Sequence, residues 1–279
     1  MKTKILLISL SVLLVIPNFI NKDINGEAKY NHIERFDPRL SSINSIDKLD
    51  KYVDAEASAK FISIYSEKYT ALLAYIISCR FYHGFSHCSL SDNWIAAVSE
   101  KIFGYGLASK VDPEQIMQYK YAACSQQAIV MMAVLRKKNI SYRKVGFPHH
   151  YALEAKINNK WYFFDPNMEP AISLSERLHE NWNGCNDNLK KYYTKHGNVN
   201  WEFGTHEEAQ YGITNEIPGQ NAKVFQSVTS FFSKILWCFP LIFAFVKRSR
   251  RSRMYAIKPI NHFPPEQNLT PVFPLKYYF

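Results

Sequence analysis

The chain lacks the cysteine spacings that bind metals or support redox chemistry. It has 279 residues and five cysteines, and none of the five stands in a Cys-x-x-Cys pair. The sequence therefore contains neither a zinc ribbon nor a dithiol redox motif, and we expect no metal and no organic cofactor. Cys79 and Cys88 are close in sequence. A disulfide between them in an oxidising compartment and two buried free thiols are both open.

Acidic residues are fewer than basic residues, but the basic residues lack the patterns of a nucleic-acid interface. The chain has 34 Lys and Arg against 24 Asp and Glu, and the basic run at 247–253 carries part of the net charge of +10. No zinc-finger spacing, RNP-like motif or basic–aromatic stripe accompanies it, so we expect no nucleic-acid partner. Internal repeats are also missing. With 47% hydrophobic and 21% charged residues, the chain is too apolar for wholesale disorder and is long enough for one sizeable domain.

Apolar segments lie near both ends of the chain. Residues 1–20 begin with Lys2 and Lys4 and continue as an apolar run, typical of an export signal. No small-x-small cleavage site follows, so a retained signal anchor and a removed signal peptide are both open. Residues 224–246 are a candidate transmembrane helix, with a helix lying on the membrane or packed on the domain as the alternative. The basic run that follows is typical of a cytoplasmic flank, which predicts an extracytoplasmic, membrane-anchored domain.

The segments between these ends predict one domain of α+β class. We expect a linker over 21–51, the domain over 52–219, and a basic, proline-rich tail over 247–279. Helices are predicted first, and each has its own sequence signal. They cover 54–77 by apolar spacing, 94–103 with Asp92 as cap and Gly104 as stop, 113–119 with Asp112 as cap and Gln115 completing a capping box, and a segment that opens at Cys124 with the stripe Ala128, Ile129, Met132 and Leu135.

An antiparallel sheet is predicted after these helices. Residues 142–147, 150–157 and 160–165 are strand candidates, and Asn158-Asn159 fits the tight turn of a hairpin between the last two. Helices followed by such a sheet define an α+β arrangement. Further along, residues 173–193 are predicted to be helical with a break at Asn183-Gly184.

Three side chains around this hairpin can form a catalytic triad. Cys124 opens a helix, where the macrodipole and unpaired N–H groups favour the thiolate. The hairpin places His150 and Asp165 on adjacent strands, so that the carboxylate can orient the imidazole. His149 competes with His150, but neighbouring strand residues point to opposite faces and the register favours His150. The alternatives are a buried thiol at Cys124, a solvated histidine and a strand-ending aspartate.

The pattern resembles the transglutaminase-like superfamily of papain-like cysteine enzymes. The matching residues lie between about 110 and 170, and Ala122 and Ala152 depart from the family, which often has glycine and an aromatic residue there. The matches are Cys124, His150, Glu154, Trp161, Tyr162, Asp165 and Pro166.

The resemblance implies a papain-like fold, with Cys124 as nucleophile, His150 as base and Asp165 as orienting carboxylate. Gln118 precedes the cysteine as in papain-like enzymes and is a candidate oxyanion donor, with an exposed helix residue as the alternative. Glu154 is expected to be structural, on the outer face of the sheet. The activity implied is that of a peptidase or amidase on a peptide or protein substrate, or of an acyltransferase, through an acyl-thioester. A non-catalytic peptide- or glycan-binding module on the same fold is the alternative.

Overall fold

The structure is a computed structural model, and it describes residues 2–246 except 33, 183, 194–196 and 206–207. The chain divides into two compact units, residues 1–244 and 245–279. Only the first two residues of the second unit are described. The predicted basic run and proline-rich tail therefore lie outside the described residues.

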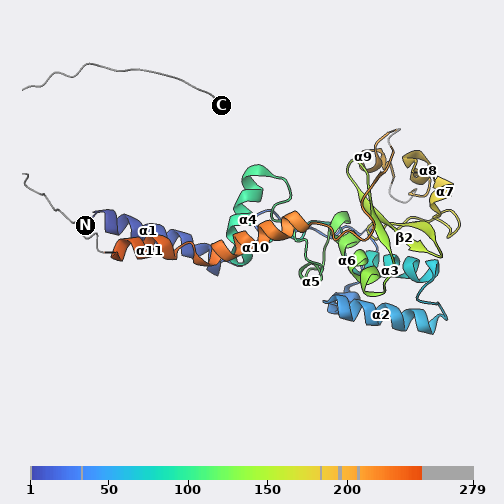
Figure 1. The fold of residues 1–279 in the computed structure, drawn as a ribbon, viewed down its shortest axis with the longest axis horizontal. Helices are drawn as coiled ribbons and strands as arrows, with labels where there is room; N and C mark the ends of the chain where they lie inside the picture. Colours follow the sequence, from blue (N-terminus) through green and yellow to red (C-terminus); the bar gives the residue numbers. More distant parts are fainter. Residues whose placement is uncertain (1, 33, 183, 194–196, 206–207, 247–279) are drawn as a thin grey trace, which may run out of the picture. The chain divides into compact units, whose positions relative to one another are not determined.

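A run of helices comes first along the chain, three consecutive strands follow, and the remaining helices come after them with one short strand among them (Figure 1). In order, the elements are α1 (Lys2–Val15), η1 (Ile16–Phe19), η2 (Pro38–Ser42), α2 (Ile46–Ala59), α3 (Glu67–Arg80), α4 (Leu90–Phe103), α5 (Pro113–Ile116), α6 (Cys124–Lys137), β1 (Tyr142–Gly146), β2 (Tyr151–Ile157), β3 (Lys160–Phe164), α7 (His179–Trp182), α8 (Asn186–Lys190), α9 (Asn200–Phe203), β4 (Gln210–Tyr211), α10 (Gln220–Ile235) and α11 (Cys238–Phe245).

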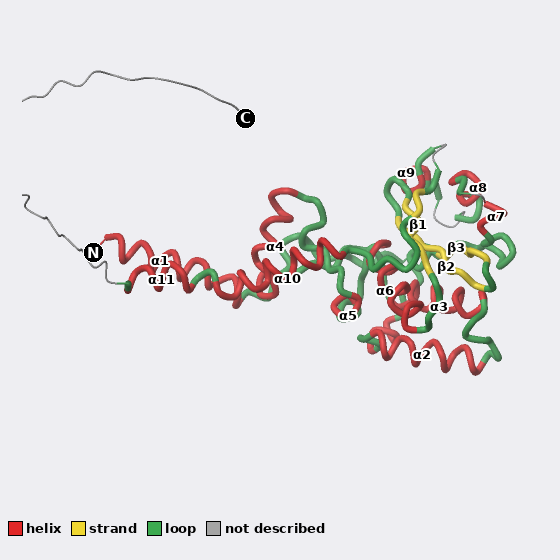
Figure 2. The backbone as a smooth tube through the Cα atoms, in the orientation of Figure 1, coloured by secondary structure: helices red, strands yellow, loops and turns green. Residues whose placement is uncertain are grey.

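A four-stranded antiparallel sheet lies at the centre of the domain, in the order β3-β2-β1-β4. The three strands predicted from the sequence are present, each within a residue or so of its predicted ends, and the α+β class is confirmed (Figure 2). Only the short β4 was not predicted, because its two residues are too few to show an alternating pattern.

The β2–β3 hairpin closes through the predicted two-residue turn. Ile157 pairs with Lys160, and Asn158 and Asn159 have φ angles of 51° and 63°. Positive φ at both central residues is the geometry of a type I′ turn, which asparagine tolerates better than most residues. This turn fixes the register, and the start of β2 and the end of β3 therefore meet at the opposite end of the hairpin.

Each face of the sheet has its own core. Leu153 and Phe164 point to one face, where α6 packs on β2 and α3 packs on both α6 and β3. Ala152 and Phe163, one residue along, point to the other face, which the segments α7 to α9 cover. The strands are therefore buried on both sides, as in a three-layered domain. The predicted stripe of α6 is fully part of the first core.

The single long helix predicted over 54–77 is wrong, because the structure has two helices there. α2 begins at Ile46, inside the predicted linker, and α3 begins at Glu67. Phe61 between them has a φ of 55°, and the Ser66 hydroxyl accepts a hydrogen bond from the backbone N–H of Tyr69 and so caps α3. The break contains no glycine or proline, and the apolar spacing continues through it, so no local pattern marks it.

Three further helix boundaries differ from prediction. α4 begins at Leu90, before the predicted start, and it kinks at Asn93. Its N-cap is Ser89, and Asp92, which was predicted as the cap, is the third residue of the capping box. α5 ends at Ile116, although Asp112 caps it as predicted. The helix predicted over 173–193 is replaced by the short helices α7 and α8, and Asn183 of its expected break lies outside the described residues.

Among the described residues, two helical segments are long and apolar enough to cross a membrane. They are Lys2–Phe19 and Gln220–Phe245, and most of their side chains are exposed. The second covers 224–245 of the predicted segment 224–246, which is divided between α10 and α11. The amide of Asn18 donates to the Ser233 carbonyl (3.0 Å), so η1 lies against the end of α10.

The kink in α4 serves its contact with α10. The Asn93 amide donates to the Gln226 carbonyl (3.0 Å) and to the Thr229 hydroxyl (2.8 Å), and its oxygen accepts from the Ser233 hydroxyl (3.0 Å). Trp94 adds a bond from its indole N–H to the Ser233 carbonyl (3.0 Å). A buried asparagine whose donors and acceptor are all used holds the two helices in one arrangement.

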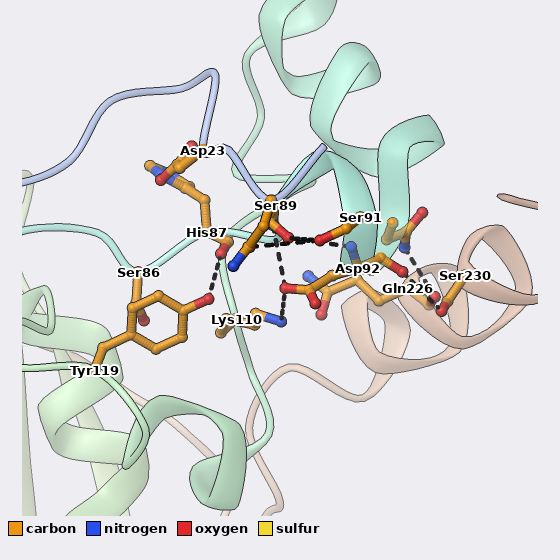
Figure 3. A network of polar contacts seen from close by, with 12 residues as sticks. Asp23, Ser86, His87, Ser89, Ser91, Asp92, Lys110, Tyr119, Gln226 and Ser230 are labelled. Carbon is orange, nitrogen blue, oxygen red and sulfur yellow. Dashed lines mark hydrogen bonds and ion pairs between the residues drawn. The ribbon is translucent and has the colours of Figure 1, made fainter. Parts of the chain in front are cut away.

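A polar network extends this junction into the loops before α6 (Figure 3). The Gln226 amide donates to the carbonyls of Leu107 and Ser109 (3.2 and 2.7 Å). The ammonium of Lys110, which is almost fully buried, binds the Asp92 carboxylate (3.1 Å). The loop that carries Lys110 is thereby fixed to both α4 and α10.

We predict that the turn residue Asn159 limits hairpin stability. Asn159→Val forces a β-branched residue into the left-handed region and should lower the free energy of unfolding by roughly 1–2 kcal/mol. Asn159→Gly is the matched control, and it should be neutral or slightly stabilising because glycine adopts this φ without strain. Urea unfolding of the full chain in detergent, followed by tryptophan fluorescence, measures both. Equal stabilities for the two variants would contradict the turn assignment.

Candidate active site

Cys124 is the first residue of α6 and is partly exposed at the edge of a cavity of about 620 Å³. The N-cap residue Ala123 has no side chain that can cap the helix. Instead, the Gln126 side chain reaches back and accepts from the Ala123 backbone N–H (3.1 Å). The first N–H groups of a helix have no acceptor within it, and Cys124 lies in this first turn.

Gln126 also fixes this helix start to the loops described above. Its amide nitrogen donates to the carbonyls of Ser86 (2.9 Å) and Lys110 (2.8 Å), and its oxygen accepts from the Ser86 N–H (2.9 Å). The residue is almost fully buried. The sequence analysis missed it, although a glutamine at the third position of a helix is a recognisable capping signal.

His150 and Asp165 meet where β2 begins and β3 ends. The imidazole Nε2 lies 2.7 Å from Asp165 Oδ2, and both side chains are buried. The structure thus brings together the two residues that the hairpin register predicted to be close. The ring packs against Phe147 (6.2 Å, stacked) and Phe203 (5.3 Å, tilted), which exclude water from it.

Asp165 is held by three further donors. Its Oδ1 accepts from the backbone N–H groups of Asn167 and Met168 (3.1 Å each), and its Oδ2 accepts from the Tyr193 hydroxyl (2.8 Å). Tyr193 is fully buried and lies in an irregular segment far along the chain. No local sequence pattern connects it to Asp165, so the sequence analysis did not find it.

A buried ion pair stabilises the loop that follows Asp165. Glu169 binds Arg177, and the Glu169 N–H donates to the Asp165 carbonyl (2.8 Å). Arg177 also donates to the Phe163 carbonyl (3.1 Å), so the pair connects this loop to the end of β3. Burial raises the pKa of Glu169 to about 7, against the opposing effect of Arg177.

The two buried partners shift each other's proton affinity. Burial by itself lowers the pKa of His150, but the charge of Asp165, the hydrogen bond to it, and the hydrogen bond and charge of Cys124 outweigh this and raise the pKa to about 10. Burial raises the pKa of Asp165, but the charge and hydrogen bond of His150 oppose this effect. Together with hydrogen bonds from the Met168 backbone and the Tyr193 side chain, they leave the pKa of Asp165 lowered. The pair is therefore an imidazolium and a carboxylate at neutral pH.

The ring orientation decides which nitrogen can serve the cavity. Since Nε2 is bonded to Asp165, Nδ1 is the ring nitrogen left for proton exchange with a group in the cavity, which Cys124 and His150 both line. A carboxylate that orients an imidazole, with a thiol at the same cavity, is the arrangement that a cysteine nucleophile and its base require.

His149 points elsewhere, as expected for a neighbouring residue. Its ring stacks on Trp201 at 4.1 Å between centroids, and its backbone N–H donates to the Glu202 carbonyl (3.1 Å). It lines the same cavity as Cys124 and His150. It does not share their hydrogen bonds.

Gln118 is not brought to the cavity. Its amide donates to the Asn44 carbonyl (2.8 Å) and to the Glu114 carbonyl (3.4 Å), and its side chain does not line the space near Cys124. The structure thus gives it the surface role that was the alternative to an oxyanion donor. The reason is that α5 ends at Ile116, so Gln118 falls in the turn after it and bonds to the segment before α2.

Glu154 is structural and lies on the face of the sheet opposite α6, as predicted, but that face is covered by other elements. It is fully buried, and its carboxylate binds Arg143 (2.7 Å) and the His179 Nδ1 (2.9 Å). The Arg143 guanidinium lies between the rings of Trp161 (4.5 Å) and Tyr211 (4.3 Å). A buried carboxylate remains in a domain when it is paired in this way.

The remaining cysteines are free. Cys79 and Cys88 are both buried thiols, so the disulfide considered for them is not formed. Within the part of the chain that the structure describes, no group of three or more histidine, cysteine or acidic side chains is placed to hold a metal ion.

Comparison with known proteins adds no assignment. No protein-family model matches the chain, and no match was found among curated proteins or among solved structures.

We predict that the stability contributed by the His150–Asp165 pair depends on pH in a defined way. The raised pKa of His150 contributes stability that is fully present below pH 6.5 and is lost as the pH rises towards 10, while the lowered pKa of Asp165 contributes stability above pH 3.8. The difference in free energy of unfolding between wild type and Asp165→Asn should therefore be largest between these two values, near pH 5, and shrink steadily at alkaline pH.

Urea unfolding at several pH values measures this difference. Tyr193→Phe is the matched control, because it removes one hydrogen bond to Asp165 without removing a charge. It should cost about 1–3 kcal/mol. A difference for Asp165→Asn that grows between pH 7 and pH 10 would show that the pair is not ionised.

Proposed function

We propose that the protein is a cysteine hydrolase that cleaves amide or peptide bonds through an acyl-thioester. The observation that carries this is the position of His150, which is hydrogen-bonded to Asp165 and lines the same open cavity as Cys124. A nucleophile, a base and a group that orients the base, each from a different element, are the parts that such chemistry needs.

The acylation step uses the proton held by His150. The Cys124 sulfur, as thiolate, attacks the carbonyl carbon of the substrate, and the C=O electron pair moves onto the oxygen. As the tetrahedral intermediate collapses, the C–N bond breaks and His150 gives its proton to the leaving amine. The products of this half-reaction are a free amine and an acyl-thioester on Cys124.

Backbone groups at the start of α6 are the candidates for stabilising the oxyanion. The N–H groups of the first turn have no acceptor within the helix, and the positive end of the helix dipole favours negative charge there. Gln126 positions this turn by its bonds to Ser86, Lys110 and Ala123. Gln118 has no part in this proposal.

Deacylation requires a second nucleophile. Neutral His150 takes a proton from water, the resulting hydroxide attacks the thioester carbonyl, and the thiolate leaves with its electron pair. An amine can replace water and yield a new amide. We favour hydrolysis, with a peptide or protein as substrate.

The fold we propose is transglutaminase-like. In support, a cysteine opens a helix that packs on an antiparallel sheet, and adjacent strands of that sheet carry the histidine and the aspartate. The residues Trp161 and Tyr162, which contribute to the resemblance, lie on the third strand. The departures at Ala122 and Ala152 leave all three reacting groups in place.

We also propose that the domain is anchored to a membrane and lies outside the cytoplasm. The support is the pair of long apolar segments, Lys2–Phe19 and Gln220–Phe245, joined where Asn18 binds Ser233. If both cross the bilayer, the two chain ends lie on the same side and the intervening domain lies on the other. Lys2 and Lys4 before the first segment favour a cytoplasmic N-terminus.

We predict that Cys124 is selectively alkylated at mildly acidic pH. At pH 6, iodoacetamide should label Cys124 faster than the other four cysteines, because the adjacent imidazolium stabilises a thiolate there. His150→Gln should slow this labelling by roughly tenfold or more. Peptide mass spectrometry of the full chain identifies the labelled residue, and Cys185→Ser, which removes another partly exposed thiol, is the control.

If Cys124 reacts at pH 6 no faster than Cys185, the enzyme proposal fails. The non-catalytic binding module would then be the better interpretation of the cavity.

Reporter fusions test the proposed membrane arrangement. Green fluorescent protein fused at either end of the chain should fluoresce, while alkaline phosphatase inserted at the exposed turn around Asn215 should be active. Alkaline phosphatase is also fused at each end in place of green fluorescent protein, and activity at both ends would contradict the proposed orientation.

A further inference from the structure

We propose that Glu202 and Trp201 form a subsite for a positively charged group, a protonated primary amine, on the substrate. This inference rests on the proposed function, because it assigns the substrate class of the same cavity. Both residues belong to α9, and both line the cavity that contains Cys124 and His150.

α9 is held rigidly beside His150. Its last residue, Phe203, is fully buried and packs on Phe147 (4.6 Å), Tyr193 (4.7 Å) and the His150 ring (5.3 Å). The buried Asn186 amide donates to the Phe203 carbonyl. A short helix fixed by an aromatic residue in the core presents its two preceding side chains to the cavity in a defined position.

One oxygen of the Glu202 carboxylate lacks a hydrogen-bond donor among the described residues. This oxygen, Oε2, is buried. A buried carboxylate oxygen without a hydrogen-bond partner costs more free energy than a neutral group in the same position, because a charged group loses more solvation free energy on burial. An ammonium group in the cavity that Glu202 lines would supply the opposite charge to this carboxylate.

Trp201 supplies a second feature that suits a cation. It is 67% exposed, although one face of its ring lies on His149. The face away from His149 is therefore accessible. The face of an indole ring attracts ammonium groups more strongly than the other aromatic side chains do.

The other charges of the cavity favour a cation over an anion. A second carboxylate, Glu34, lines the same space, and burial raises its pKa against the effect of the His83 backbone N–H, which it accepts at 2.5 Å. The exposed guanidinium of Arg35 also lines the cavity, but it lies over the Tyr75 ring at 6.0 Å. The two carboxylates thus share the cavity with Arg35, which lies over Tyr75, and with His150, whose charge is balanced by Asp165.

The position of this subsite assigns the charge to the same substrate molecule that Cys124 attacks. One cavity of about 620 Å³ contains both, and this volume accommodates a substrate of a few residues. We infer a substrate that carries its primary amine close to the scissile carbonyl. A lysine side chain and a free amino terminus both fit this chemistry.

The test compares the rates at which small thiosulfonates of different charge label Cys124 in the full chain. The reagents are aminoethyl, sulfonatoethyl and methyl methanethiosulfonate, which are cationic, anionic and neutral. In wild type, the cationic reagent should label Cys124 faster than the neutral one, and the ratio of these two rates is the quantity compared between variants. Glu202→Gln should reduce this ratio by about fivefold and Trp201→Ala by about threefold. Glu216→Gln removes an exposed carboxylate outside the cavity, and it is the control that should keep the wild-type ratio.

The outcomes separate the two proposals. If the neutral reagent does not label Cys124, the proposed function fails and the subsite fails with it. If the neutral reagent labels Cys124 but Glu202→Gln and Glu216→Gln both keep the wild-type ratio, only the subsite is overturned. Circular dichroism of each variant checks that it has folded.

A second measurement distinguishes the two sources of the amine. Fluorogenic amides of acetyl-lysine and of norleucine with a free amino terminus are compared with the amide of acetyl-norleucine, which has no charge. The substrate whose kcat/KM falls most in Glu202→Gln relative to acetyl-norleucine identifies the recognised amine. Equal effects of Glu202→Gln on all three would contradict the subsite.

Discussion

The hydrogen-bonded pair of His150 and Asp165 is the constraint on which the rest of the domain depends. Two ionised side chains in an apolar interior are stable only when their geometry is good and their remaining hydrogen-bonding groups are satisfied. The structure meets this condition from several directions at once. The hairpin sets the register, the turn after β3 supplies two N–H groups, and Tyr193 supplies a hydroxyl from a distant segment.

The same pair explains why the sheet is covered on both faces. Cys124 lines the cavity beside the imidazole from the layer that contains α6. From the layer that contains α8 and α9, Phe203 packs on the imidazole and Tyr193 donates to Asp165. Removing either layer would expose one side of the pair to water. The proposed triad therefore depends on all three layers together.

The sequence predicted the parts of the domain whose signals are local. The change of apolar pattern after residue 139, the apolar content of the segments that follow and the pair Asn158-Asn159 predicted the three long strands and their turn. This was enough to place His150 next to Asp165. The break between α2 and α3 was missed because apolar spacing runs through it without glycine or proline. Tyr193, Trp201 and Glu202 were missed for another reason, since they come close to the site only through packing of a segment with almost no regular pattern. Gln118 was assigned by its offset from Cys124, and such an offset fails when the short helix between them ends early.

The contact between α4 and α10 also determines how α10 is turned about its own axis. Gln226, Thr229, Ser230 and Ser233 recur at the spacing of one helical face, and all four bond to α4 or to the loop beside it. Val224, Val228 and Phe231 consequently point outward. Rotation by a single residue, about 100°, would bring Phe231 to the place of Ser230 at the Asp92 carbonyl and break every one of these bonds. The rotation of α10 about its own axis is thus set by asparagine and serine side chains where it contacts α4. It does not depend on the apolar medium that surrounds its outward face.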